Sequence, residues 1–320
     1  MKILLNDTRA VRAVHTRSTS RRALIIFPGA LGDLICAVPS IRAIERHNPE
    51  VSFELMARGD LARFSVGRFG ITRGHSIDRP EVAHLFSEHA QPTERARAFF
   101  VAFHSVHSFF AADHRGFRQA LSTILAGNVR FYPFRPAAEG HVSLCYLRAI
   151  GAQPVAPLYE DIELLPNDLE SASTALKGRG FDASRILLIL PGSGNRSKNW
   201  PAERFAELTE RVRPLCSPLL VCGPAEEGLE RMFVERGLET LSGIDLGGLA
   251  GLARIAGCFV GNDSGVSHLA AATGCRGIVI FGPTDPVRWR PLGQVKIIRR
   301  QPIEALEVDE LFAALAAELA

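Results

Sequence analysis

The chain has 320 residues, with 37 Lys and Arg against 34 Asp and Glu, and its formal net charge of +3 is too small to predict a nucleic-acid partner. Hydrophobic residues make up 47% of the chain and charged residues 22%, a mixture that excludes a disordered chain, a coiled coil and a small disulfide-stabilised scaffold. At this length we expect about two domains.

The cysteines and the apolar runs indicate the compartment. Six cysteines show no Cys-x-x-Cys pair, and Cys36, Cys222 and Cys258 lie in apolar runs, which favours a reducing, cytosolic environment. No apolar run approaches the ~20 residues that cross a bilayer. The stretch at 20–22 looks like a twin-arginine export signal, but Asp33 interrupts the apolar run that follows. We therefore expect this segment to stay in the protein. The basic N-terminus before it could contact anionic lipid, but we favour a solvated face.

The first half begins with a strand, a turn and a helix. Residues 23–27 are predicted to form a buried strand, and residues 28–33 a turn that contains two glycines. A helix should follow over residues 34–47, with Pro39 either bending it or lying in its first turns. Residues 51–55 then read as the next strand. This order is typical of an α/β protein.

Residues 86–120 are harder to interpret. They contain four histidines among several phenylalanines, namely His89, His104, His107 and His114. Their spacing matches no known metal site, so we expect a helix and a strand with scattered surface histidines. Residues 151–168 mix prolines with acidic residues and are the candidate linker. The linker divides the chain into two domains, over residues 1–160 and 161–320. The terminal helix is a candidate to pack back onto the first domain.

Strands and helices alternate clearly in the second half. Strands are predicted at 185–190, 219–222, 257–260, 277–281 and 295–298, and helices at 201–212, from 226, at 266–273 and at 309–319. Strands separated by helices of this length predict a parallel sheet with helices on both faces. The fold class is therefore α/β, with two facing Rossmann-like domains. The dinucleotide fingerprint Gly-x-Gly-x-x-Gly is absent.

Ligands of open parallel sheets bind at the carboxyl ends of the strands, so the turns that follow strands are the candidate sites. In the first such turn, Gly29 and Gly32 permit close backbone approach. Asp33 lies near the start of a helix. It could serve as the helix N-cap, as a carboxylate aimed into the interdomain cleft, or as both.

The second turn is the loop at 191–201, which has small residues and two cations. Such a loop suits a diphosphate, because backbone amides cradle the oxygens and Lys198 adds a point charge. Its spacing is not that of a Walker loop, and Ser193 is not in a Gly-x-Ser-x-Gly elbow. The alternative is a polar surface loop, in which Trp200 serves as a packing residue and Asn199 as a cap of the next helix.

The third turn, at 261–268, runs into an apolar helix whose amino end favours an anion. Asp263 could cap this helix, with Ser264 and Gly265 presenting amides to a phosphate. His268 either points into the cleft or is a buried histidine with its hydrogen bonds satisfied. A rigid turn follows at 281–286.

Three stretches together, at 29–43, 191–208 and 261–291, resemble the ADP-heptose:lipopolysaccharide heptosyltransferases of glycosyltransferase family 9. The resemblance implies a GT-B fold, in which the N-terminal domain holds the acceptor and the C-terminal domain holds the nucleotide sugar across an interdomain cleft. It also implies an inverting, metal-independent reaction with no cofactor beyond the donor substrate, ADP-heptose.

The resemblance assigns roles to individual residues. Asp33 is the expected catalytic carboxylate, with Gly29 and Gly32 in the acceptor-side loop. Lys198 is the second expected catalytic residue, and it shares the donor phosphate with Ser193 and Gly194. The remaining expected donor contacts are Asp263, Ser264, Gly265 and His268. Either Glu226 or Glu227 resembles the acidic residue that holds the nucleoside, and the spacing does not decide between them.

The chemistry of these residues agrees with such a reaction. An inverting transfer needs a base for the acceptor hydroxyl and positive charge for the leaving diphosphate. We expect heptose transfer to a lipopolysaccharide inner-core acceptor in the cytoplasm, with peripheral association to the inner membrane if that acceptor is lipid-linked. The alternatives are another nucleotide-sugar enzyme of the GT-B fold with a different glycan or protein acceptor, and a non-catalytic sugar-nucleotide-binding module.

Overall fold

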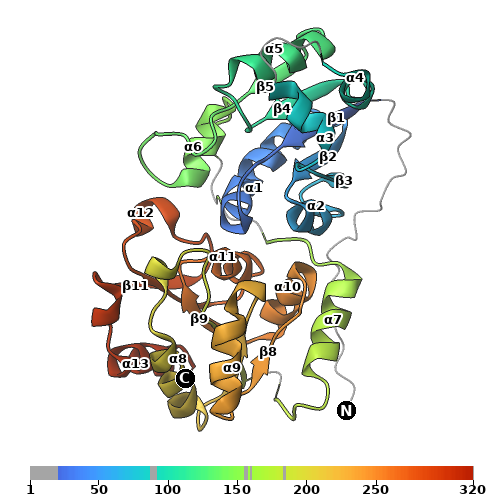
Figure 1. Cartoon of the computed structure of the whole chain (residues 1–320). Coiled ribbons are helices and arrows are strands. Elements are labelled where there is room, and N and C mark those ends of the chain that lie inside the picture. The colour runs from blue at the N-terminus through green and yellow to red at the C-terminus, as the bar shows by residue number, and fades with distance from the viewer. Residues whose placement is uncertain (1–20, 87–91, 155–157, 159–160, 183–184, 320) are drawn as a thin grey trace.

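A computed structural model describes residues 21–86, 92–154, 158, 161–182 and 185–319. The basic stretch before residue 21 and His89 lie outside the described residues, so the expectations for them are not addressed. Figure 1 shows an N-terminal half above a C-terminal half, each built on its own sheet.

The N-terminal half has a five-stranded parallel sheet in the order β3-β2-β1-β4-β5. Its strands are β1 (Arg22–Ile26), β2 (Ser52–Ala57), β3 (Ile71–Ser76), β4 (Ser105–Ser108) and β5 (Val129–Phe131). Its helices are α1 (Leu31–Arg46), α2 (Gly59–Ser65), α3 (Pro80–Ala83), α4 (Glu94–Phe100), α5 (Arg115–Ile124) and α6 (Val142–Ala149). Alternate residues of β1 enter two different buried clusters, Ala23 and Ile25 one and Leu24 and Ile26 the other. Because both faces are covered, β1 reads as a continuous apolar run.

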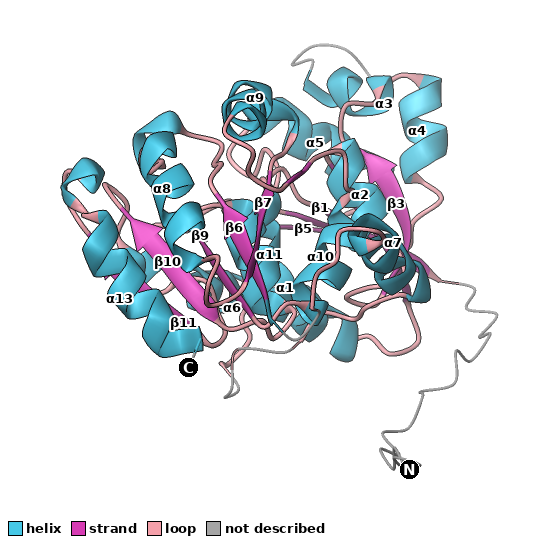
Figure 2. Ribbon diagram, turned by 90° about the horizontal axis from the view of Figure 1, so that it is seen from below, coloured by secondary structure: helices cyan, strands magenta, loops and turns pink. Residues whose placement is uncertain are grey.

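The C-terminal half has a six-stranded parallel sheet in the order β11-β10-β9-β6-β7-β8. Its strands are β6 (Ile186–Leu190), β7 (Ser217–Val221), β8 (Thr240–Leu241), β9 (Cys258–Asn262), β10 (Gly277–Phe281) and β11 (Val295–Arg299). Its helices are α7 (Pro166–Leu176), α8 (Ala202–Val212), α9 (Glu227–Glu235), α10 (Leu246–Ile255), α11 (Gly265–Ala272), α12 (Pro286–Trp289) and α13 (Val308–Leu319). Helices flank this sheet on both faces (Figure 2), which confirms the expected α/β architecture.

Strand order reverses between β1 and β4 in one sheet and between β6 and β9 in the other. At such a switch point the loops after neighbouring strands diverge and leave a crevice for a ligand. The loops that carry Asp33, Lys198 and Asp263 follow β1, β6 and β9, so the topology brings each of them to a switch point.

Three residues that could serve as helix N-caps are not the N-cap residues. The N-cap of α1 is Ala30, and Asp33 lies in the first turn of the helix, where its side chain accepts a hydrogen bond from the Ala30 amide. The N-cap of α11 is Ser264, whose hydroxyl accepts a hydrogen bond from the Ser267 amide, because the Asp263 side chain is engaged by Lys198. The N-cap of α8 is Pro201, while Asn199 accepts a hydrogen bond from a loop hydroxyl.

Two other expectations need correction. Helix α13 packs against α8 and buries Leu311 and Leu315 in the core of the C-terminal half, so it does not cross back to the N-terminal sheet. His107 is buried rather than on the surface, since it lies on β4 beneath the helices of one sheet face. None of the helices in the described ranges has both the length and the apolar character that crossing a bilayer demands.

The two halves touch where α1 and α11 begin. A Cβ atom on Gly265 would lie 2.9 Å from the Leu31 Cβ, so the helix crossing requires glycine there. On the far side of the joint, Arg68 forms a buried ion pair with Asp168 at the start of α7. These contacts connect the two halves.

Candidate active site

The Asp33 carboxylate lies in the first turn of α1 and is held from two sides. The Ala30 amide donates to its Oδ2 at 3.1 Å. Arg135, in the loop after β5, donates from Nε to Oδ1 and from Nη2 to Oδ2, each at 2.8 Å. The Asp33 side chain is only 4% exposed and that of Arg135 is 52% exposed. The hydrogen bonds to Asp33 raise the pKa of the Arg135 guanidinium.

The loop that carries Arg135 is tied to the other half of the molecule. Arg288, in α12, donates to the carbonyl oxygens of Pro136 at 2.6 Å and Ala138 at 2.8 Å. The Arg135 guanidinium lies 5.6 Å from the centre of the Trp289 ring. The backbone of Arg135 is in the left-handed conformation, with φ of 51°. A non-glycine residue in this conformation is strained, and such strain is common at functional sites. Sequence reasoning missed Arg135, because no motif surrounds it.

Lys198 lies on the C-terminal side of the joint. Its Nζ is 2.8 Å from Oδ2 of Asp263, and the Thr284 hydroxyl donates to the same oxygen at 2.6 Å. The Asp263 side chain is 4% exposed and that of Lys198 is 27% exposed. Asp263 therefore orients Lys198 and leaves the ammonium group accessible. Thr284 was expected only as part of a rigid turn, and its role depends on a contact with a residue 21 positions away.

The amino end of α11 presents backbone donors beside this lysine. The amides of Gly265 and Val266 have no hydrogen-bond partner among the described residues, as expected in the first turn of a helix. His268 is buried, with Nδ1 3.6 Å from Sγ of Cys36 on α1. Burial lowers the pKa of His268 to about 4, so the ring is neutral near pH 7. A Cβ on Gly32 would lie 3.3 Å from Cδ2 of His268, so glycine at this position leaves space for the imidazole ring.

Beside the loop after β6 lies a cavity of about 640 Å³, here called the C-terminal cavity. It is lined by Pro191, Ser193, Gly194, Arg196, Asn199, Trp200, Pro201, Ala202, Glu226, Gly228 and Leu229. Its walls are partly apolar and its polar groups are few, which is typical of ligand pockets.

Glu226, and not Glu227, lines the C-terminal cavity. Its Oε2 accepts a hydrogen bond from the Gly223 amide at 2.7 Å. A Cβ on Gly192 would lie 2.3 Å from the Glu226 Cδ, so glycine is needed for this carboxylate to reach the loop. The expected packing role of Trp200 is confirmed, since its ring is buried and its Nε1 donates to the Leu306 carbonyl oxygen at 2.9 Å.

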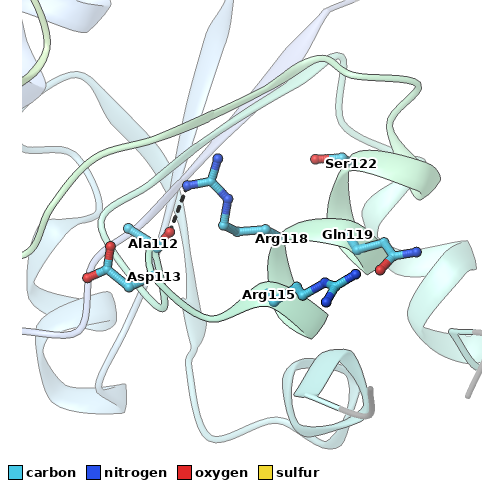
Figure 3. A pocket seen from close by; sticks show the side chains of 6 residues that line it. All are labelled: Ala112, Asp113, Arg115, Arg118, Gln119 and Ser122. Carbon is cyan, nitrogen blue, oxygen red and sulfur yellow. Dashed lines mark hydrogen bonds between the residues drawn. The ribbon is translucent and has the colours of Figure 1, made fainter. Parts of the chain in front are cut away.

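A shallow hollow of about 610 Å³ lies on the N-terminal half along α5 (Figure 3). It is lined by Ala112, Asp113, Arg115, Arg118, Gln119 and Ser122. Arg118 donates to the Ala112 carbonyl oxygen at 2.8 Å. Since β4 and β1 are parallel neighbours, the loop that leads into α5 leaves the same edge of the sheet as the turn that carries Asp33.

Within the described ranges, no three His, Cys, Asp or Glu side chains converge in a way that could hold a metal ion. The site geometry therefore comprises an arginine-bound carboxylate, an aspartate-bound lysine, two unpaired amides and a half-apolar cavity.

Comparison with known proteins shows which proteins the chain resembles. Residues 154–310 match the model of glycosyltransferase family 9 (heptosyltransferase). The chain carries a family 9 domain and is a glycosyltransferase. Lipopolysaccharide heptosyltransferase 1 of Escherichia coli K12 is 25% identical over 305 residues, which cover 89% of this chain and 95% of the relative. Lipopolysaccharide heptosyltransferase 1 of Pseudomonas aeruginosa is 31% identical over 159 residues, 47% of this chain and 42% of the relative.

Solved structures share the fold of this glycosyltransferase. The family 9 glycosyl transferase of Veillonella parvula has a TM-score of 0.73 at 17% identity and covers 93% of this chain and 97% of its own. E. coli ADP-heptose lps heptosyltransferase II has a TM-score of 0.72 at 15% identity, with coverage of 93% and 98%. These likenesses confirm the expected GT-B fold.

Proposed function

We propose that this glycosyltransferase moves a heptose from ADP-heptose to a lipopolysaccharide inner-core acceptor, with inversion at the anomeric carbon and without a metal ion. The observation that carries the proposal is the placement of Asp33 in the first turn of α1 on one half, and of Lys198 beside Asp263 on the other, at the joint where α1 and α11 begin. The charges of both, and of Asp263, act on the same buried ring of His268.

The donor would lie mostly on the C-terminal half. We place the nucleoside in the C-terminal cavity, where Leu229 and Pro201 offer apolar surface and Oε1 of Glu226 is available to a ribose hydroxyl. The diphosphate would bind the Lys198 ammonium and the amides of Gly265 and Val266, because a helix amino end stabilises negative charge. Ser193 and Gly194 would line its path, and His268 would support the α11 turn from behind as a neutral ring.

The acceptor hydroxyl would attack the anomeric carbon as the bond to the diphosphate breaks and ADP leaves with the electron pair. Asp33 would take the proton. Its Oδ2 already accepts two hydrogen bonds and its Oδ1 only one, so Oδ1 keeps a lone pair for this proton. A positioned base typically supplies ~10²–10⁴ in rate. Lys198 and the α11 amides would stabilise the charge that grows on the departing ADP.

The acceptor would lie on the N-terminal half. Arg115 and Arg118 line the α5 hollow, which suits an anionic saccharide. A lipid-linked acceptor would require peripheral association of the protein with the cytoplasmic face of the inner membrane. A cytoplasmic location agrees with the six cysteines, all free and buried.

The test is ADP release from ADP-heptose with and without a lipid A–Kdo acceptor. Release that depends on the acceptor supports the proposal. Release only with another glycan or a protein would instead make the chain a different nucleotide-sugar enzyme. Donor binding without turnover over a panel of acceptors would make it a non-catalytic binding module.

A further inference from the structure

A second cavity lies at the edge of the N-terminal sheet that is remote from Asp33. It has a volume of about 640 Å³ and lies where β1, β4 and β5 begin and where α1 and α6 end. We call it the strand-edge cavity. Helix α1 runs between this cavity and Asp33, and the 16 residues of the helix span about 24 Å. The strand-edge cavity is therefore distinct from the proposed donor and acceptor sites.

The polar lining of this cavity is basic. Its titratable side chains are Arg21, His47, His104, His107, Arg130 and Tyr132, and no Asp or Glu lines it. The side chains of Arg21, His104 and Arg130 make no hydrogen bond or ion pair with any other described residue. Two arginines thus border one concave surface without an anionic partner from the described chain, although arginine in such a position commonly pairs with a carboxylate or a phosphate.

The floor of the strand-edge cavity carries a neutral hydrogen-bonding group. His107 is buried, and its Nδ1 lies 3.0 Å from the Tyr132 hydroxyl. Burial first, and then the charge of Arg130, lower the pKa of His107 to about 4, so the ring is neutral near pH 7. When the hydroxyl donates to Nδ1, the proton of the ring is on Nε2, which has no partner among the described residues and is a donor to an oxygen ligand.

The helix ends at this cavity do not cancel its basic character. Carbonyl groups at a helix carboxyl end attract cations, but those of Ala43, Ile44 and Glu45 in α1 already accept hydrogen bonds. Nδ1 of His47 lies 2.6 Å from the Ala43 carbonyl oxygen, and Asn48 donates to that of Ile44 at 2.8 Å. At the end of α6, the Gly151 amide donates to the Arg148 carbonyl oxygen at 3.0 Å. These carbonyl oxygens are therefore already engaged by donors of the chain itself.

We propose that the strand-edge cavity binds a small organic phosphate. The phosphate would pair with Arg130, which the register of β4 and β5 places opposite His107, because guanidinium groups bind phosphate through paired hydrogen bonds. The volume is within the range of cavities that hold small metabolites, roughly 300–1,000 Å³. The apolar side chains of Ile44 and Ile150 would contact the organic part. The proposal does not depend on the reaction assigned to the other edge of the sheet.

Calorimetric titration with glucose 6-phosphate, inorganic phosphate and glucose tests this proposal on the full chain. We expect glucose 6-phosphate to bind, inorganic phosphate to bind more weakly, and glucose not to bind. Arg130→Gln should weaken glucose 6-phosphate binding at least about tenfold, because a charged hydrogen bond is worth about 1.5–3 kcal/mol. Arg130 is exposed, so this variant should fold, and Arg299→Gln on the exposed edge of β11 is the matched control.

Two further variants locate the binding. Tyr132→Phe should also weaken it, since the His107 ring loses the hydroxyl that sets its protonated nitrogen. Lys198→Ala should leave it unchanged. The proposal is overturned if the wild-type chain does not bind glucose 6-phosphate, if Arg130→Gln binds it as well as Arg299→Gln does, or if only Lys198→Ala abolishes binding, which would place the ligand at the donor site.

Discussion

Arg135 binds both carboxylate oxygens of Asp33, although 102 positions separate the two residues in the chain. The loop of Arg135 is in turn held by Arg288 from the other half of the molecule. The position of the proposed base therefore depends on the joint between the two sheets, and not on α1 alone.

Arg135→Lys should slow transfer, because an ammonium group cannot bridge both oxygens of Asp33 as the planar guanidinium does. We expect kcat to fall about tenfold to a hundredfold, the equivalent of roughly 1.5–3 kcal/mol for a lost charged hydrogen bond. ADP affinity should stay within about twofold, since Arg135 would not contact the nucleotide. Steady-state kinetics and ADP titration measure the two effects. Arg236→Lys, at the exposed end of α9, is the control, and an equal loss of ADP affinity would contradict the assigned role.

Lys198→Ala should weaken both donor binding and turnover, with turnover falling roughly 10²–10³-fold, the typical cost of a group that stabilises transition-state charge. Thr284→Val keeps the Lys198–Asp263 ion pair and removes one hydrogen bond to Asp263, so its effect should be much smaller. Lys296→Ala, on the exposed face of β11, should behave as wild type. The placement of the diphosphate is wrong if Lys198→Ala binds ADP as tightly as the wild-type chain.

Two buried histidines predict how stability changes with pH. Burial lowers the pKa of both His107 and His268 from 6.5 to about 4. The unfolded chain therefore takes up protons below pH 6.5 that the folded chain refuses until about pH 4. Stability should be full above pH 6.5 and should fall as the pH drops from there toward 4, by at most about 1.4 kcal/mol per pH unit for each ring. Urea unfolding at several pH values measures this slope. His107→Gln should reduce it, and a slope unchanged in that variant would be inconsistent with a buried neutral His107.

Gly265→Ala should destabilise the joint, because its Cβ would lie 2.9 Å from the Leu31 Cβ and 3.1 Å from the Gly32 amide nitrogen. Overpacking of this kind typically lowers the free energy of unfolding by roughly 1–3 kcal/mol. Gly228→Ala in α9 is the stability control, since a Cβ there meets no atom within 4 Å and alanine favours helices. Thermal unfolding should show a lower midpoint for Gly265→Ala only. Equal midpoints for the two variants would mean that the helix crossing tolerates a side chain.

Local pattern was sufficient to predict much of this fold. Apolar runs followed by glycine turns and amphipathic helices predicted both parallel sheets, and the strand from Gly277 to Phe281 has the predicted bounds. The same pattern placed Asp33 and Lys198 shortly after strands, and the segments that follow parallel strands meet at one edge of the sheet.

Contacts between distant segments could not be predicted in this way. Nothing near Arg135 in the sequence indicates that its loop returns to Asp33, and Asp263 could equally have capped α11. Asp263 instead forms an ion pair with Lys198 from another loop, and the Ser264 hydroxyl accepts the hydrogen bond from the Ser267 amide of α11. The burial of His107 likewise depends on helices that are distant in the chain. Residue spacing in the sequence predicts which face of a helix or strand is buried. The contact partner of a side chain depends on how distant segments pack together.

The most direct test of the central claim follows the sugar itself. ADP-heptose labelled in the heptose is incubated with a lipid A–Kdo acceptor and either the wild-type chain or Asp33→Asn, which keeps the shape of the side chain and removes its basicity. The account predicts that the wild-type chain moves the label to the acceptor with the opposite anomeric configuration. It also predicts that Asp33→Asn still binds ADP but transfers at least about 10²-fold more slowly. Transfer by Asp33→Asn at a near-normal rate, or a product with retained configuration, would contradict it.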